Sequence, residues 1–130
     1  MQILIKFDTD GKIVPFSNGK KITIDDSPFL LFLASAGMCA AHYVREFIQN
    51  RSLSLDNVSI METVLYNNET HMAEDITIHV ELPQSFPIKY KTSSLVIGNL
   101  IFKKYTNCFF VGTLSPNCSN ITLFNIIITS

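Results

Sequence analysis

One apolar segment places the tightest limit on how this chain folds. The thirteen residues from Phe29 to Ala41 carry no charge and, apart from Ser35, no polar side chain. A membrane span needs about 20 such residues, so a run of this length is typical of a buried core helix. Ser27 suits the N-cap and Pro28 the first helical position, which predicts a helix over 29–47 that stops before Asn50.

The residues on either side of this helix predict strands. Alternating segments at 2–7, 12–16 and 20–24 are joined by Asp10-Gly11 and Asn18-Gly19, which are hairpin signals. Two longer alternating segments follow the helix at 58–66 and 76–82. Residues 91–107 favour a second helix and 121–129 a closing strand. The order β-β-β-α-β-β-α-β predicts one α+β domain over residues 1–130, with antiparallel sheet.

A helix that is apolar on every side has to be covered on every side. One small sheet covers one side of it, and the second helix covers a further part. We expect a partner subunit to cover the rest, which makes the protein a homodimer.

Composition excludes several classes of protein. The 130 residues are 47% hydrophobic and 16% charged, with 10 basic and 11 acidic groups, which excludes a disordered chain. A net charge of −1 offers no basic surface to neutralise phosphates, so we expect no nucleic-acid partner. The apolar start breaks at Lys6 and Asp8, unlike a signal peptide, and we expect no membrane segment and a cytoplasmic location with reduced thiols.

The three cysteines are the candidate reactive residues of the chain. Spacing alone favours the same interpretation for each of them, a small buried hydrophobic residue; they are Cys39, Cys108 and Cys118. Cys39 and His42 have a spacing compatible with metal ligation, but no second pair with zinc-like spacing accompanies them. We therefore expect neither a metal nor another cofactor, and we interpret Cys118 as structural.

Two segments resemble signatures of the OsmC/Ohr family. The first runs from Ser27-Pro28 through the apolar stretch to Cys39, with the proline eleven residues before the cysteine. The second is Cys-x-Val-x-x-x-Leu at the end of the next helix, met by Cys108 and Leu114, with Phe110 where valine is usual. The resemblance implies the OsmC-like fold, in which antiparallel sheets surround a long buried central helix, and an intertwined dimer.

The resemblance also implies a thiol-dependent peroxidase that acts on organic hydroperoxides. Cys39 would become a sulfenic acid and Cys108 would condense with it to a disulfide, which an external thiol or dithiol reduces. The substrate, an organic hydroperoxide or another small apolar molecule, would lie among apolar side chains. The residues expected to line this pocket are Phe29, Phe32, Met38, Phe109 and Phe110.

The chain departs from the family where the thiol is activated. Family peroxidases lower the thiol pKa with an arginine near the first turn, held by a glutamate after the proline. Thr9 stands at the arginine position, and Phe29 and Leu30 stand at the glutamate positions. The substitutes we consider are His42, three residues after Cys39, and a lysine of the N-terminal strands, Lys6 or Lys12.

The missing pair leaves two further interpretations open. In the first, the chain is a non-catalytic OsmC-fold protein that binds a small apolar ligand or senses oxidants stoichiometrically. A hot-dog-like thioesterase is a more distant alternative, and it requires a carboxylate near the long helix, where Asp25 and Asp26 are the nearest in sequence.

Overall fold

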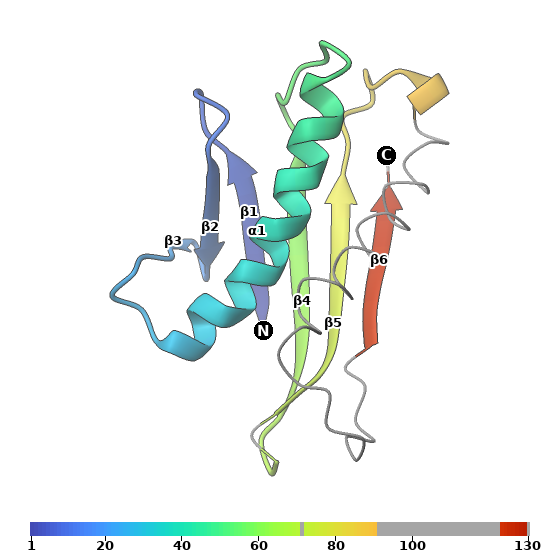
Figure 1. Cartoon of the computed structure of the whole chain (residues 1–130). Coiled ribbons are helices and arrows are strands. Elements are labelled where there is room, and N and C mark those ends of the chain that lie inside the picture. Colours follow the sequence, from blue (N-terminus) through green and yellow to red (C-terminus); the bar gives the residue numbers. More distant parts are fainter. Residues whose placement is uncertain (71, 91–122, 130) are drawn as a thin grey trace.

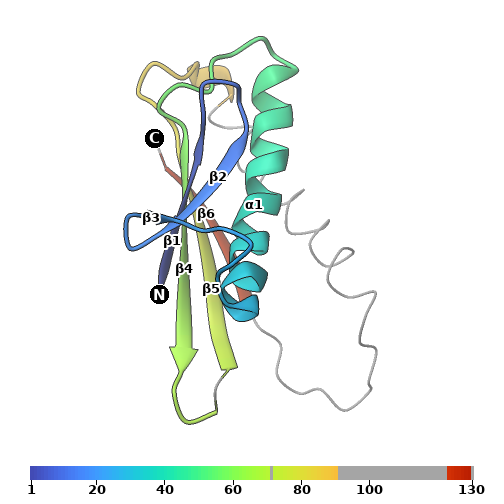
Figure 2. The same cartoon turned by 90° about the vertical axis from the view of Figure 1, so that its left-hand side faces the viewer.

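The fold is a single twisted sheet with one long helix across one of its faces. The computed structural model describes residues 1–70, 72–90 and 123–129. Its six-stranded sheet has the order β3-β2-β1-β4-β5-β6, and helix α1 lies along one face, as Figures 1 and 2 show from two sides. The elements are β1 (Gln2–Phe7), β2 (Ile13–Ser17), β3 (Lys20–Lys21), α1 (Pro28–Gln49), β4 (Ser59–Asn67), β5 (Met72–Glu81) and β6 (Leu123–Thr129).

Both N-terminal hairpins form where the turn residues predict them. Asn18 and Gly19 have φ of 50° and 75°, the two positive values that a two-residue hairpin turn requires. β3 is shorter than the predicted 20–24, because the chain leaves the sheet after Lys21. Asp26 Oδ2 accepts a hydrogen bond from the Thr23 backbone N–H at 2.7 Å, which turns the chain toward α1 and leaves Ile24 exposed.

Helix α1 begins where the cap predicts. Ser27 Oγ accepts a hydrogen bond from the Leu30 backbone N–H at 3.3 Å, and Pro28 occupies the first turn. Within the described residues, the sheet covers α1 along one side. Phe32 is 54% exposed, and Phe29, whose ring contacts that of Tyr66 on β4, is 40% exposed. The residues buried against the sheet are Leu33, Ala34, Ala36, Gly37, Ala40, Ala41, Val44 and Ile48.

The sheet is mixed rather than wholly antiparallel, which corrects the prediction from sequence. β1 pairs with β2 and β4, and β4 with β5, all antiparallel, but β6 pairs with β5 in parallel, with Ile78 opposite Ile126. A parallel pair needs a long crossover connection, and residues 82–122 are long enough to supply one. Residues 88–90 are helical, and the predicted second helix, 91–107, falls outside the described residues.

The core lies between α1 and the central strands. Ile3 and Ile5 of β1, Ile60 of β4 and Ile78 of β5 are fully buried there. One charged side chain, Glu62 of β4, is fully buried among them. In the part of the chain that the structure describes, no helix has the length and hydropathy of a membrane span.

Candidate functional site

Cys39 lies in the middle of α1, at the boundary between its buried and exposed sides. Its side chain is half-buried and packs against the core. Ala40 and Ala41 next to it face the sheet, whereas Ser35 and His42 lie on the exposed side of the helix. The helix therefore holds the Cys39 thiol beside the side of α1 that the sheet leaves uncovered.

His42 lies on this uncovered side, and both of its ring nitrogens have partners there. Nδ1 is 3.1 Å from Arg45 Nη2, and Nε2 is 3.4 Å from Glu46 Oε1. A guanidinium only donates, so Nδ1 accepts and the ring carries its proton on Nε2, toward Glu46. Activation of the Cys39 thiol by His42 stays a prediction, and it requires the ring to leave these partners.

The other proposed substitutes for the family arginine lie elsewhere. Ile3 and Ile5 of β1 are buried on the α1 side of the sheet, so strand alternation puts Lys6 on the opposite face, away from Cys39 of the same chain. The Lys12 ammonium lies 3.3 Å from Asp10 within the first turn. An arginine does reach this turn from α1, because Arg45 Nη1 donates to the Gly11 carbonyl at 3.1 Å.

Three of the predicted pocket residues lie on the same helix as Cys39. Phe32 is exposed, the Phe29 ring lies 5.7 Å from that of Tyr66 on β4, and Met38 is half-buried. The other predicted site residues, Cys108, Phe109 and Phe110, and also Cys118, fall in residues 91–122, outside the described part of the chain. Of the three, Phe32 shares a side of the helix with Cys39, because the two are seven residues apart, which is close to two turns.

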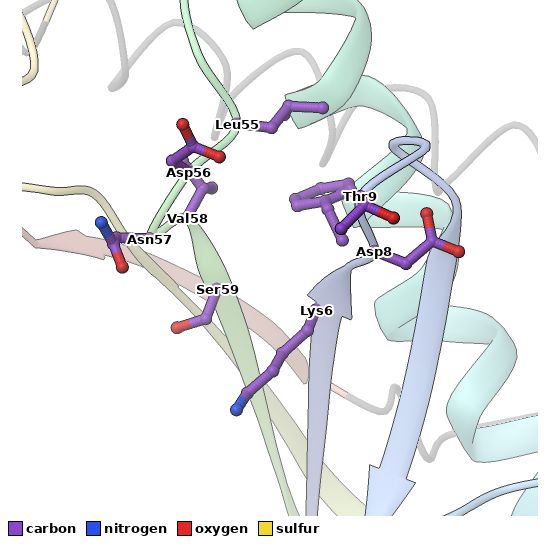
Figure 3. A pocket seen from close by; sticks show the side chains of 9 residues that line it. Lys6, Asp8, Thr9, Leu55, Asp56, Asn57, Val58 and Ser59 are labelled. Carbon is purple, nitrogen blue, oxygen red and sulfur yellow. The ribbon is translucent and has the colours of Figure 1, made fainter.

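An open pocket of 720 Å³ lies at the other end of the sheet, where β1 ends and β4 begins. Figure 3 shows Lys6 and Thr9 on one side of it and Asp56 and Ser59 on the other. The residues that line it are Lys6, Phe7, Asp8, Thr9, Leu55, Asp56, Asn57, Val58 and Ser59. None of these lining residues belongs to α1, so this hollow is separate from the predicted substrate pocket.

Glu62 is a residue of the site region that the sequence interpretation missed. Its Oε2 accepts a hydrogen bond from the backbone N–H of Gly37 at 2.9 Å, two residues before Cys39. Burial raises the pKa of Glu62 from 4.5 to about 7, and the Gly37 hydrogen bond lowers it in part. The signal was present in the alternation of β4, where Glu62 shares a face with Ile60 and Val64.

Asp26, one of the two carboxylates considered for a thioesterase, has a structural role. Asp26 is bound to the Thr23 backbone and closes the turn before α1. Among the described residues no group of three or more His, Cys, Asp or Glu side chains is arranged to hold a metal ion.

Comparison with known proteins gives one informative likeness. No protein-family model matches the chain, and no curated protein sequence matches it. The structure is similar to that of an OsmC-like protein from Mycoplasma pneumoniae, with a TM-score of 0.53 and 13% sequence identity. The match covers 98% of this chain and 94% of that one. At this identity the likeness shows the fold alone, and it confirms the OsmC-like fold predicted from the two cysteine segments.

Proposed function

We propose that this chain, with its OsmC-like fold, is a thiol-dependent peroxidase of the OsmC/Ohr type that reduces organic hydroperoxides. The observation that carries the proposal is the place of Cys39. Its thiol is half-buried at the middle of the long helix of an OsmC-like fold, beside a side of that helix on which Phe32 is exposed. A reactive thiol next to uncovered aromatic surface suits an apolar peroxide.

The proposed reaction consumes one hydroperoxide and two electrons. The Cys39 thiolate attacks the outer peroxide oxygen, the O–O bond breaks, and the leaving alkoxide takes a proton to become an alcohol. The product on the protein is a sulfenic acid. The Cys108 thiol then attacks its sulfur, forms the Cys39–Cys108 disulfide and releases water. An external thiol or dithiol returns both cysteines to the reduced state by disulfide exchange.

The apolar part of the hydroperoxide would lie against Phe29, Phe32 and Met38, which share α1 with Cys39. In the same proposal Phe109 and Phe110, next to Cys108 in sequence, complete the pocket. Burial of a hydrocarbon chain against such rings is favourable by roughly 25 cal/mol per Å². This preference would select organic hydroperoxides over hydrogen peroxide.

The same proposal includes a homodimer in the cytoplasm. Phe32 is 54% exposed, and a second subunit packed on this side of α1 would bury it. Light scattering at micromolar protein should then show twice the chain mass, and Phe32→Glu should lower the dimer fraction. Leu65, exposed on the opposite face of the sheet, supplies the matched control Leu65→Glu. A monomeric wild-type protein would refute the dimer.

The direct test is consumption of cumene hydroperoxide by the fully reduced protein with a dithiol reductant present. We expect turnover by the wild type, none by Cys39→Ser, and in Cys108→Ser a sulfenic acid that does not proceed to the intramolecular disulfide. Cys118→Ser is the matched control and should retain turnover. No consumption by protein whose thiols are intact would rule out the peroxidase.

A second candidate is a non-catalytic OsmC-fold protein that binds a small apolar ligand or senses oxidants stoichiometrically. Two observations favour it: Thr9 replaces the family arginine, and both ring nitrogens of His42 are engaged by Arg45 and Glu46. The pH dependence of Cys39 alkylation separates the two candidates. A midpoint at or above about 8.5 supports the non-catalytic protein, and one well below neutrality supports catalysis.

A further inference from the structure

Glu62 is the one charged side chain that the structure buries completely in the described core. It lies on β4, near the middle of the sheet, where its register partners are Ile3 on β1 and Ile78 on β5, both fully buried. Its Oε1 is buried and has no hydrogen-bond partner among the described residues. A carboxyl in this position is costly to keep, so the contact that it does make calls for a physical explanation.

That contact is with the backbone of α1. The Gly37 N–H donates to Glu62 Oε2 at 2.9 Å. A Cβ added to Gly37 would overlap the Ile5 Cδ1 methyl and fall 2.5 Å from Glu62 Oε2, so both side chains would have to shift to admit any residue other than glycine. Glycine in a helix interior costs about 1 kcal/mol relative to alanine. The close approach of β4 to the helix supplies a reason for glycine at this position.

The surroundings of Glu62 provide no compensating charge within the described residues. β1 and β5 present isoleucine and valine side chains to it, and α1 presents Gly37 and its small neighbours Ala36 and Ala40. The Met1 ammonium donates to the Val64 carbonyl at 3.0 Å, two residues further along β4. The nearest titratable groups along α1 are Cys39 and, further on, His42. An ionised Glu62 would therefore be a charge in the core with one oxygen unsolvated.

We propose that the packing of α1 over Glu62 is linked to the proton on that carboxyl, and that loss of the Glu62 proton loosens the helix at Cys39. An ionised carboxylate needs water or a donor at Oε1, and water can reach it only if α1 moves away from β4. Cys39 follows Gly37 by two residues and moves with the helix. Glu62 is thus a positioning residue, and its relevance to peroxide reduction rests on the proposed function.

Two effects act on the proton of Glu62: burial favours the neutral carboxyl, and the Gly37 hydrogen bond favours the carboxylate. Burial is the larger effect and raises the pKa of Glu62 to about 7, so both protonation states are populated near neutral pH. Neutral Glu62 keeps the two layers in contact, and ionised Glu62 favours the loosened helix with a more accessible thiol.

The test compares Cys39 alkylation in the wild type and in Glu62→Gln, followed by peptide-resolved mass spectrometry. Dividing the wild-type alkylation rate by the variant rate at each pH removes the effect of the titration of the Cys39 thiol, which is common to both proteins. We expect a ratio near 1 at about pH 5.5 that rises to at least about threefold by about pH 8.5, with a midpoint near 7. Glu69→Gln, at an exposed loop position, is the matched control, and its ratio should stay flat. A flat ratio for Glu62→Gln would overturn the proposal.

A measurement on the wild type keeps the proposal testable if the variant does not fold. The Gly37 amide proton should show an NMR chemical shift that titrates near pH 7, because its acceptor changes charge. A shift that stays constant across neutral pH would also overturn the proposal. Neither readout uses peroxide, so a protein that passes both but consumes no hydroperoxide would refute the peroxidase and leave the Glu62 proposal standing.

Discussion

The Gly37 amide in the middle of α1 donates a hydrogen bond to the buried Glu62 carboxyl of β4, across the interface between helix and sheet. A helix normally presents side chains rather than backbone to a sheet. Here the absence of a Cβ on Gly37 brings the backbone within 2.9 Å of a carboxyl oxygen. The contact joins the helix that carries Cys39 to a central strand of the sheet.

Glu62 should make the stability of the protein fall as pH rises. Its pKa is about 7 in the folded protein against 4.5 ordinarily, so between these values the folded state holds one proton more than the unfolded state. The free energy of unfolding should therefore decrease by up to about 3 kcal/mol between about pH 4.5 and about pH 7, and show no further change from this group above that.

Denaturant titrations at several pH values check this prediction. Glu62→Gln keeps a hydrogen-bond acceptor for Gly37 but cannot ionise, so its stability should vary less over the same range. Glu69→Gln should keep the wild-type dependence. Identical pH dependence in wild type and Glu62→Gln would show that Glu62 does not titrate in the folded core.

Gly37→Ala should destabilise the protein by about 2 kcal/mol, although alanine is the better helix former by about 1 kcal/mol. The new methyl group would overlap the Ile5 side chain and crowd Glu62 Oε2. Ser35→Ala is the control, because Ser35 is exposed on the same helix and its Oγ bonds only the Phe32 carbonyl of its own turn. Thermal unfolding measures both. A Gly37→Ala protein as stable as the wild type would contradict the close approach.

Ser27→Ala should cost about 1 kcal/mol of stability, because it removes the oxygen that accepts from the Leu30 N–H at the start of α1. Ser27→Asp restores an acceptor and should recover the loss. Circular dichroism during denaturation measures both variants. Equal losses in the two would mean that the side-chain oxygen does not cap the helix.

His42→Ala should leave the alkylation rate of Cys39 within about twofold of the wild type, because Arg45 and Glu46 already engage both ring nitrogens. The rate is measured on reduced protein near neutral pH. A fall of about tenfold or more would show that the ring turns toward the thiol and activates it, as its spacing from Cys39 in the sequence suggests.

Much of the local structure is predictable from the residues themselves. β1 has the predicted bounds, the Asn18-Gly19 turn has the expected backbone, and Ser27 caps the helix that carries Cys39. The candidate site was predictable only in part. The helix and the cysteine follow from one segment, but the orientation of Lys6 and the partners of His42 depend on how separate segments meet.

The sequence by itself determined the conformations that a few adjacent residues decide: tight turns, a helix cap, and strands of alternating side chains. Only the tertiary structure decided that β6 pairs with β5 in parallel, that Phe32 of α1 is exposed, and that Glu62 is buried beneath Gly37. Turn and cap preferences act within a few residues, whereas burial and charge depend on which distant segments come into contact.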